Sequence, residues 1–310
     1  MMMLGKDAFQ KARALGSVHH YWPAVIRADF LRNSFPEARR RAQSGLTGLL
    51  GKSGALEVRL ARSAADIRRA QRLRYEVFYD ELAAQPGVIA RLTRHDADRF
   101  DACCDHIIVT DSSVGPKGRV VGAYRLLRQD VAARHGGFYS QDEFRIDTLV
   151  ARHPELRFLE LGRSCVLKEY RDKRTVELLW QAIYTYVRHH RIDAMFGCAS
   201  FHGVDAGKLA LPLSFLAHHA RADEAWRVAA APERAVAMNI LPSDAVDARL
   251  ALRTLPALIK GYLRLGAWFG EHAVIDRAFN TTDVLVVLPV SRIDPRYIDY
   301  FSEEAGRFAA

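Results

Sequence analysis

Charged residues interrupt a stretch that otherwise has the pattern of a buried strand. Residues 158–167 alternate and then run apolar, yet Glu160 and Arg163 lie within this run and Lys168 follows it. A buried charge is costly unless it is paired or performs a function. We therefore expect Glu160 either to form a structural ion pair, with Arg163 or Arg125, or to take part in chemistry, and Arg163 likewise to be paired or functional.

A polar turn follows this strand and precedes a helix. Residues 169–175 form the turn, and from Val176 to Val187 apolar residues recur at three- and four-residue spacing, which is typical of a helix packed on a sheet. Thr175 is the predicted helix cap. A strand, a short turn and a helix start can present free N–H groups to a phosphate-bearing ligand.

The elements around this unit follow from hydrophobic periodicity and from Gly, Pro and Ser positions. The predicted strands are 56–61, 106–110, 119–127, 194–200, 225–229 and 282–290, with 106–127 as a hairpin and 194–200 parallel to 158–167. One predicted helix begins at Ser63. The other predicted helices cover 176–187, 209–221 and 245–269, and the last is broken near Pro256. This order predicts an α/β protein with a mixed sheet (α+β mixed sheet) and helices on both faces.

Composition limits the class of protein. The chain has 310 residues, 49% hydrophobic and 26% charged, which is ordinary for a soluble globular protein. Its four cysteines lack C-x-x-C spacing, so we expect buried thiols in a reducing compartment and no metal site. No apolar run reaches the length of a membrane span, and the start lacks a signal-peptide core. We predict a cytoplasmic protein.

Positive charge is concentrated near the start of the chain. The net charge is +9, and the first fifty residues contribute eight Lys or Arg against three Asp or Glu. Such a surface suits nucleic acid, anionic lipid or an acidic carrier protein, and no nucleic-acid recognition signature is present. We interpret 1–55 as a basic extension that either touches the inner face of the membrane or packs as an arm. The main domain is predicted at 56–310, with a C-terminal elaboration from about 205.

Motifs and order together resemble the GNAT acyltransferase superfamily. More narrowly, they are similar to the ornithine N-α-acyltransferases of ornithine-lipid synthesis, which are relatives of the acyl-homoserine-lactone synthases. The matching segments are LRYEVFYDEL at 73–82, DRFDACCDH at 98–106, VVGAYRLL at 120–127, LELGRSCVLKEYR at 159–171 and the block at 259–290. The resemblance implies a GNAT-like (acyl-CoA N-acyltransferase-like) fold across most of residues 56–295.

The resemblance also implies which residues act on the acceptor. The group's recurring pattern falls here on Arg74, Phe78, Asp101, Asp105, Arg125, Glu160 and Arg163. Glu160 and Arg163 are the implied catalytic residues, with Glu160 deprotonating the acceptor amine directly or through a water. An α-amine with a pKa of about 7.7–8.0 needs such a base, and burial raises the pKa of a carboxyl group.

The other residues of this pattern allow more than one role. Arg74, Arg125 and Arg163 can clamp the acceptor's carboxylate, because a guanidinium matches it bidentately. Alternatively they form an Arg–Asp network that holds the first helix to the sheet. Asp101 and Asp105 fit that network, and equally they fit the side-chain ammonium of ornithine.

The donor side departs from the acetyl-CoA enzymes of this superfamily. Those enzymes carry a glycine-containing loop that cradles a pyrophosphate, whereas the turn at 170–175 has no glycine. The phosphopantetheine of an acyl carrier protein offers one phosphodiester, which Arg171, Lys173, Arg174 and Thr175 can hold. The resemblance implies that backbone N–H groups around Cys165 and Val166 meet the oxyanion. Carrier protein is therefore favoured over CoA as donor, and the thioester is a co-substrate, with no cofactor.

These observations predict transfer of a (3-hydroxy)acyl chain from acyl carrier protein to the α-amine of ornithine, giving lyso-ornithine lipid. Cys165 has no histidine spaced as a base partner, so direct transfer without an acyl-enzyme is expected. The alternatives are an acyl-homoserine-lactone-type or other N-acyl amino acid synthase, or a basic membrane- or nucleic-acid-binding module without chemistry. The long block at 209–295 argues against a signal synthase.

Overall fold

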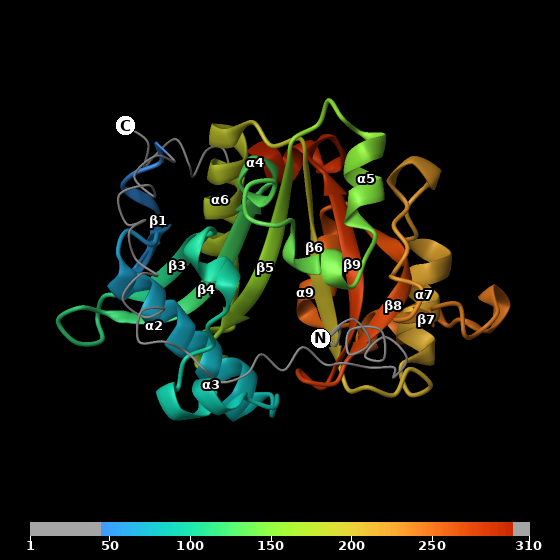
Figure 1. Ribbon diagram of the computed structural model, residues 1–310, viewed down its shortest axis with the longest axis horizontal. Helices are drawn as coiled ribbons and strands as arrows, with labels where there is room; N and C mark the ends of the chain where they lie inside the picture. The colour runs from blue at the N-terminus through green and yellow to red at the C-terminus, as the bar shows by residue number, and fades with distance from the viewer. Residues whose placement is uncertain (1–44, 300–310) are drawn as a thin grey trace, which may run out of the picture. The chain divides into compact units, whose positions relative to one another are not determined.

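A nine-stranded mixed sheet runs through residues 45–299, the part of the chain that the computed structural model describes (Figure 1). Its spatial order is β1-β2-β3-β4-β5-β6-β9-β8-β7, and only β5 and β6 are parallel neighbours. The strands are β1 (Leu49–Ser53), β2 (Leu56–Leu60), β3 (Asp105–Asp111), β4 (Arg119–Arg128), β5 (Phe158–Val166), β6 (Ala194–His202), β7 (Ala235–Ala237), β8 (Trp268–Asp276) and β9 (Thr281–Pro289). The predicted mixed α/β sheet is confirmed.

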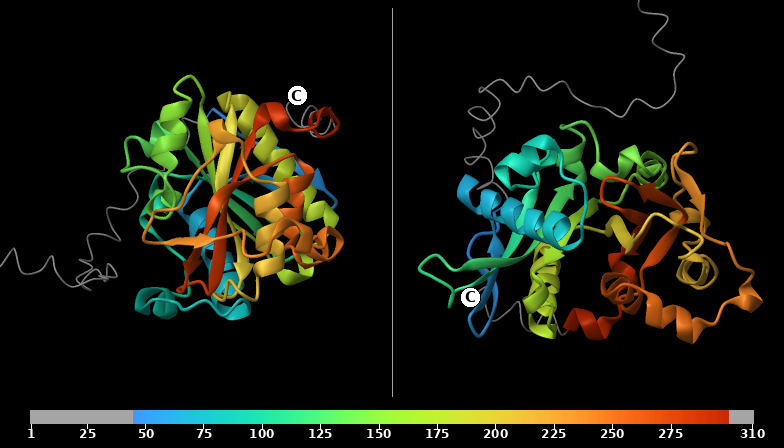
Figure 2. Two further views of the ribbon diagram at one scale, coloured as in Figure 1. Left: turned by 90° about the vertical axis from the view of Figure 1, so that its right-hand side faces the viewer. Right: turned by 90° about the horizontal axis from the view of Figure 1, so that it is seen from below.

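Helices cover both faces of the sheet, as expected. The α-helices are α2 (Ala64–Tyr75), α3 (Val88–Thr93), α4 (Gln129–Ala132), α5 (Ile146–Arg152), α6 (Lys173–His190), α7 (Ala210–His219), α8 (Ala248–Thr254) and α9 (Ala257–Arg264). The shorter turns are a π-helix, η4 (Glu76–Glu81), and the 3₁₀ turns η5 (Arg99–Ala102), η6 (Tyr139–Asp142), η7 (Lys168–Tyr170), η8 (Glu224–Trp226), η9 (Ser243–Ala245) and η10 (Val290–Arg292). The right-hand view of Figure 2 shows α2 and α6 on opposite faces of the sheet.

Strand periodicity divides the core between the two faces. On the central strands, Leu159, Met195 and Val286 belong to the cluster packed by α6 and α9. Their neighbours Phe158, Phe196, Leu285 and Val287 belong to a second cluster, which α5 covers. Successive side chains of a strand point to opposite faces, so Glu160 lies on the α5 face, in phase with Phe158.

The parallel strands β5 and β6 separate after a short paired region. Hydrogen-bonded register joins them from Phe158 and Ala194 to Glu160 and Phe196. Both strands then continue for six more residues, β5 along β4 and β6 along β9. Glu160 therefore stands where the sheet begins to open.

Several sequence predictions are confirmed in detail. Ser63 caps α2 by accepting a hydrogen bond from Asp66 N at 3.1 Å. The hairpin of β3 and β4, the β5–α6–β6 unit and the helix break at Pro256 also agree with the expectation.

The predicted strand at 225–229 is wrong. Residues Glu224–Trp226 form the 3₁₀ turn η8 instead, and Val228 and Ala230 are buried by packing on the α5 face. The predicted helix at 245–269 extends too far, because Gly266, at φ 88°, ends the helical segment and Trp268 begins β8. Strand β8 was missed because its apolar residues are interrupted by glycine and charged residues.

The helix cap is also corrected. Asp172, not Thr175, is the N-cap of α6, and its carboxylate accepts hydrogen bonds from Thr175 N at 3.0 Å and Thr175 Oγ1 at 3.2 Å. Asp172 precedes the first turn, where an oxygen can reach a free N–H. Thr175 lies one turn inside, fully buried.

The predicted boundary at residue 55 stays a prediction. Most of the segment 1–55 lies outside the described residues, but Leu49–Ser53 form β1 and pair with β2 at the edge of the sheet. The strand lies in the glycine-rich stretch 45–54, at the end of the segment interpreted as the basic extension.

Gly197 marks the point where β5 and β6 part. A methyl group added there would lie 2.1 Å from Leu161 O, a backbone atom that cannot move aside. We expect Gly197→Ala to lower the free energy of unfolding in urea by about 1–3 kcal/mol. The control is Gly261→Ala in α9, where nothing lies within 4 Å and where alanine favours the helix. Equal stability of Gly197→Ala and the wild type would contradict the close approach.

Candidate active site

Glu160 is buried at the point where the strands separate. Only 4% of its surface is exposed. Its Oε2 accepts a hydrogen bond from Tyr139 N at 2.8 Å, and its Oε1 accepts from Ser140 N at 2.7 Å and Ser140 Oγ at 2.6 Å. Burial raises the pKa of Glu160 against these hydrogen bonds. The turn η6 thus fixes a carboxyl group whose proton affinity is above the usual range.

The ion-pair interpretation of Glu160 is wrong. Among the described residues, Glu160 forms no salt bridge with Arg125 or Arg163, and its oxygens are taken by η6. The role of Glu160 as a base stays a prediction, now with Tyr139 and Ser140 as the groups that orient it.

Arg74 anchors α2 to the loop before β3. Its guanidinium holds Asp101 bidentately, at 2.8 Å and 2.7 Å, and its Nε lies 2.8 Å from Asp96 Oδ2. Arg74 is almost fully buried, and so are both aspartates. Burial alone would raise the pKa of Asp101, but the charge and hydrogen bonds of Arg74 hold it well below its usual range.

Arg125 and Arg163 extend this network into the sheet. Arg125 Nη1 contacts Asp98 Oδ1 at 2.6 Å and Asp101 Oδ1 at 3.2 Å. Arg163 Nε lies 3.3 Å from Asp96 Oδ2, and Arg163 Nη2 donates to Asp98 Oδ2 at 3.3 Å. Three arginines and three aspartates therefore share one network of alternating sign.

Arg163 occupies an unusual backbone position. Its φ is 50°, in the left-handed region that a residue with a Cβ rarely adopts, at the register shift between β4 and β5. Its guanidinium lies over the rings of Tyr139, at 4.8 Å, and Phe279, at 4.9 Å, and donates to Tyr139 Oη at 3.2 Å. Phe78 packs edge-on against Phe279 at 5.8 Å.

The structure brings together most of the residues predicted for the acceptor side. Arg74, Asp101, Arg125 and Arg163 share the network, as the structural alternative expected. Asp105 lies apart from it, because its carboxylate contacts Tyr186 Oη at 2.6 Å and Arg128 at 3.4 Å.

Two members of this network, Asp96 and Asp98, were missed by sequence reasoning. The sequence holds a signal for them, because acidic residues recur at two- and three-residue spacing from 96 to 101. That spacing presents several carboxylates to one side of a tight loop, but it does not show which of them meets an arginine.

The donor side is built from the end of β5 and the start of α6. Cys165 is buried, and burial raises the pKa of its thiol to about 12, so it is a poor nucleophile. Leu167 N donates to Val121 O of β4 at 2.9 Å. Because successive N–H groups of a strand point to opposite edges, Val166 N–H points to the edge that β6 has left.

The cations predicted for the donor differ in their surroundings. Lys173 and Arg174 are exposed at the first turn of α6 and pair with Glu177 and Asp172 on the same helix end. Arg171 is held by Glu81 at 2.6 Å and 2.7 Å and also donates to Val166 O. Thr175 is buried and donates to the cap, so it does not face a ligand.

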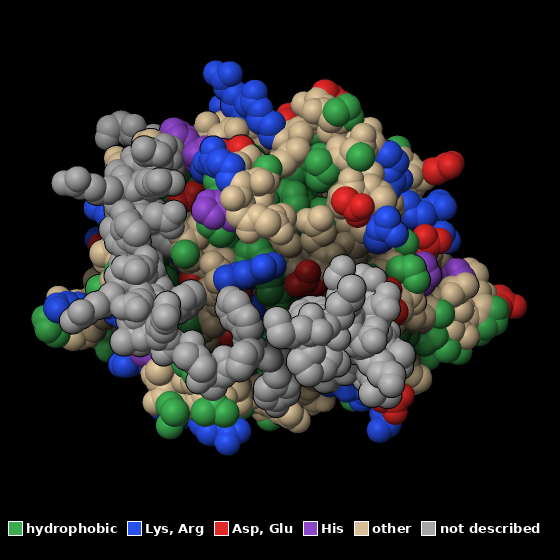
Figure 3. All heavy atoms as spheres, viewed as in Figure 1, with side chains coloured by type: hydrophobic (Ala, Val, Ile, Leu, Met, Phe, Trp, Pro, Cys, Tyr) green, Lys and Arg blue, Asp and Glu red, His purple; other side chains and the backbone are tan. Residues whose placement is uncertain are grey.

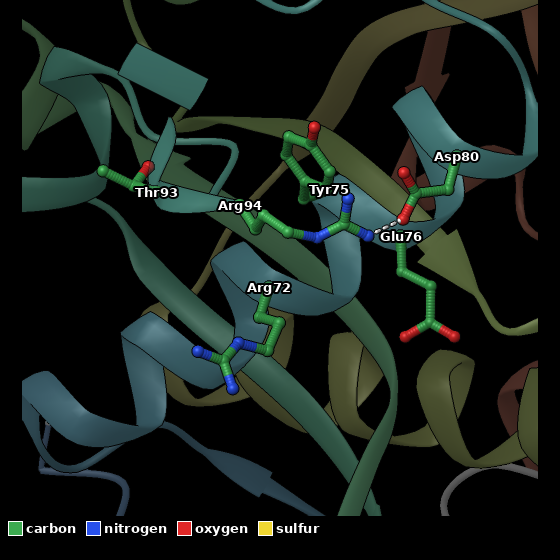
Figure 4. Close-up of a pocket in the computed structure, with 6 residues that line it drawn as sticks. All are labelled: Arg72, Tyr75, Glu76, Asp80, Thr93 and Arg94. Atoms are coloured by element: carbon green, nitrogen blue, oxygen red, sulfur yellow. Dashed lines mark hydrogen bonds and ion pairs between the residues drawn. The ribbon is translucent and has the colours of Figure 1, made fainter. Parts of the chain in front are cut away.

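The surface is hollowed over the diverging strands. The space-filling view shows a depression near the middle of the face, with acidic side chains in its depth (Figure 3). A separate pocket lies between α2 and α3 and contains none of the predicted site residues. Figure 4 shows Arg94 reaching across that pocket to pair with Asp80 beside Tyr75.

The chain is similar to known proteins. The sequence model of a family described as an acetyltransferase (GNAT) domain matches residues 73–181, from α2 to the middle of α6. Solved structures similar in fold include an N-acyl amino acid synthase from uncultured soil microbes, FeeM (TM-score 0.45, 10% identity, 76% of this chain and 92% of that one). A CoA-dependent acyl-homoserine lactone synthase, BjaI, has a TM-score of 0.43 and 12% identity over 78% of this chain and 83% of its own. The match of residues 73–181 to the GNAT domain confirms the predicted GNAT-like acyltransferase class.

Curated relatives narrow the family. An L-ornithine N(alpha)-acyltransferase of Rhizobium meliloti is 52% identical over 88% of this chain and 93% of its own length. Proteins of the same name from Brucella abortus and Agrobacterium fabrum are 52% and 54% identical over 86% and 84% of this chain and 96% and 89% of their own. The chain belongs to the L-ornithine N(alpha)-acyltransferase family and is an acyltransferase.

In residues 45–299, no helix combines the length and apolar character that crossing a bilayer requires. The predicted peripheral contact of the basic extension falls largely on residues outside the described range and stays a prediction.

The buried network predicts a pH-dependent stability. The pKa of Asp101 is lower in the folded chain than in the unfolded one, so its contribution is complete above the unfolded pKa of about 3.9 and is lost as pH falls below it. We expect Asp101→Asn to lower the free energy of unfolding by about 3–5 kcal/mol at pH 7, because Arg74 loses its bidentate partner and keeps only the carboxylate of Asp96.

The measurement is urea unfolding of both proteins between pH 7 and pH 3. The difference in the free energy of unfolding between the wild type and Asp101→Asn should become smaller below about pH 4. A constant difference across this range would contradict the depressed pKa. Asp130→Asn, on the exposed start of α4, is the control and should change stability little.

Proposed function

We propose that this protein transfers a (3-hydroxy)acyl chain from acyl carrier protein to the α-amine of ornithine and so forms lyso-ornithine lipid. The observation that carries the acceptor assignment is the 52% identity, across 88% of the chain, to an enzyme named for that reaction. The open edge between β5 and β6, with Glu160 at its apex, supports an acyl-transfer site.

The reaction forms one bond and breaks one. The neutral α-amine attacks the thioester carbonyl carbon, an N–C bond forms, the C–S bond breaks, and the thiolate leaves. Glu160 takes the proton that the ammonium must lose, directly or through a water. The nitrogen loses a second proton as the amide forms, and that proton goes to the leaving thiolate. A base with a raised pKa suits this task, because the amine's own pKa lies near neutrality.

Val166 N–H is the proposed oxyanion donor. It lies at the end of β5 and points to the edge from which β6 has turned away, as the bond of Leu167 N to Val121 indicates. A fixed N–H aimed at the carbonyl oxygen stabilises the charge that develops there.

The start of α6 supports a carrier protein as donor. Asp172 already occupies the helix N-terminus with its carboxylate, so little room or positive potential is left for a pyrophosphate. Lys168, Lys173 and Arg174 are exposed around the same turn, and a cationic rim attracts an acidic carrier.

An assay with purified protein tests the function and its donor. We expect N-acylornithine with a free side-chain amine when ornithine and 3-hydroxyacyl carrier protein are supplied, and much less product with the acyl-CoA. Arg174→Glu should raise KM for the carrier protein severalfold and leave KM for ornithine unchanged, because charge at the rim acts on encounter. Lys208→Glu, an exposed site before α7, is the charge-matched control. If acyl-CoA is used as well as acyl carrier protein, the proposed donor is wrong. A product derived from homoserine would favour an acyl-homoserine-lactone-type synthase.

Glu160→Gln tests the proposed base. We expect kcat to fall by about 100-fold or more, which is the typical contribution of a general base. The amide must place an NH₂ against Tyr139 N–H or Ser140 N–H, so some stability is also lost. Ser140→Ala is the matched control, because it removes one hydrogen bond and keeps the carboxylate. If both variants lose the same activity, Glu160 anchors η6 and is not the base.

A further inference from the structure

Three carboxylates gather beyond Glu160 on the same face of the sheet. Glu143 follows η6, Asp276 ends β8, and Asp283 lies in β9. One oxygen from each lies no more than 4.8 Å from the other two. Glu143 and Asp283 are 8% exposed, and Asp276 is half-buried.

Strand register places this cluster beside the opening. Glu160 faces Phe196 across β5 and β6, and Ser200, four residues along β6, faces Asp283. Cys198, between them on β6, donates to Glu143 Oε2 at 3.8 Å. Because Glu160, Cys198 and Asp283 alternate in phase with the α5-face core, their side chains line the same side of the separating strands.

Short connections tie the cluster to the residues around Glu160. Glu143 N donates to Ser140 O at 3.0 Å, and Ser140 in turn donates to Glu160. Asp276 Oδ1 accepts from Phe279 N at 3.1 Å, and the Phe279 ring lies 4.9 Å from the Arg163 guanidinium. The carboxylate cluster and the Arg163 guanidinium are therefore neighbours, connected through Phe279.

The cluster has more negative charge than its surroundings balance. Arg234 contacts Glu143 at 3.2 Å from the rim. Asp283 Oδ1 is buried and has no hydrogen-bond partner in the described part of the chain, although Ser200 and Thr281 lie near enough to lower the pKa of that carboxyl group. Burial and the neighbouring carboxylates raise the pKa of Glu143 to about 7 and that of Asp283 to about 6. Within residues 45–299, Glu143 is paired with Arg234, whereas Asp276 and Asp283 form no salt bridge.

We propose that Glu143, Asp276 and Asp283 bind the side-chain ammonium of ornithine and thereby select the acceptor. This inference rests on the proposed function. It adds a contact for the side chain of ornithine to the contact of its α-amine with Glu160. An ammonium nitrogen that donates to three oxygens at about 2.8 Å holds them about 4.6 Å apart, which is compatible with the spacing of this cluster. The neighbouring arginines suit the α-carboxylate at the other end of ornithine.

The aspartates predicted earlier for this ammonium are engaged elsewhere. Asp101 is held bidentately by Arg74, and Asp105 contacts Tyr186 and Arg128. Carboxylates that repel one another attract a cation strongly. Carboxylates already paired with arginine attract it less. Oxygen ligands lie 2.0–2.6 Å from a small divalent ion, so such an ion would hold the carboxylate oxygens closer together than an ammonium does.

The experiment compares ornithine with norvaline, which has the same carbon chain without the side-chain amine. For the wild type we expect kcat/KM to favour ornithine strongly. In Asp283→Asn and Asp276→Asn this preference should fall by about 10-fold or more, mainly through KM for ornithine, because a charge-assisted hydrogen bond is lost. Asp142→Asn, an exposed neighbour of Glu143, is the matched control and should keep the wild-type preference.

Stability provides a second readout. Asp283 carries its charge at a cost to folding, because its folded pKa is above the unfolded value, so Asp283→Asn should unfold at no lower urea concentration than the wild type at pH 7.5. A loss of preference in a variant that folds as well as the wild type supports a binding role.

Three results would overturn the inference. Unchanged preference in both variants would show that the cluster does not contact the amine. Activity that EDTA abolishes and Mg²⁺, Mn²⁺ or Ca²⁺ restores, with calorimetric metal binding that Asp283→Asn loses, would show a metal site. If the wild type acylates homoserine lactone or norvaline but not ornithine, the proposed function itself fails, which the first two results do not imply.

Discussion

The separation of β5 and β6 is the constraint on which the rest of the structure depends. The two strands share a ladder only as far as Glu160 and Phe196, and each then keeps a partner on its outer edge alone. Backbone N–H groups such as that of Val166 are left without a strand opposite them. Buried backbone groups are normally paired, so this edge is available to a ligand. Gly197 permits the geometry by letting the β5 backbone pass within reach of its Cα.

Two kinds of buried charge flank this opening, and they differ in their balance. Around Arg74, Arg125 and Arg163, opposite charges alternate, and the arginines hold the pKa values of Asp98 and Asp101 below their usual range. Such a network fixes α2 and the loop before β3 against the sheet. Around Asp283, like charges adjoin, and burial together with the neighbouring carboxylates raises the pKa values of Asp283 and Glu143. A balanced network gives rigidity, whereas an unbalanced one retains affinity for a cation.

Long periodic elements were predictable because their signal is local. The apolar spacing of α6, the alternation of β2, β3 and β4, and the apolar runs of β5 and β9 depend on neighbours within a few residues. Strand β8 and the segment after Trp226 were misjudged because their burial depends on distant partners, Val284 of β9 and Phe144 before α5. A cap is similarly decided by which side chain reaches a free N–H, and Asp172 competes with Thr175 for it.

The sequence by itself determined that Arg125, Glu160 and Arg163 are charges within core strands, because a charge amid apolar residues is visible without coordinates. The resemblance to a known family predicted roles for these residues and for Arg74. Only the tertiary structure decided their partners. Asp96 and Asp98 meet arginines from α2, β4 and β5, and Glu143, Asp276 and Asp283 converge from η6 and the β8–β9 hairpin. Electrostatic energy depends on distances between groups far apart along the chain, and those distances exist only once the sheet has formed.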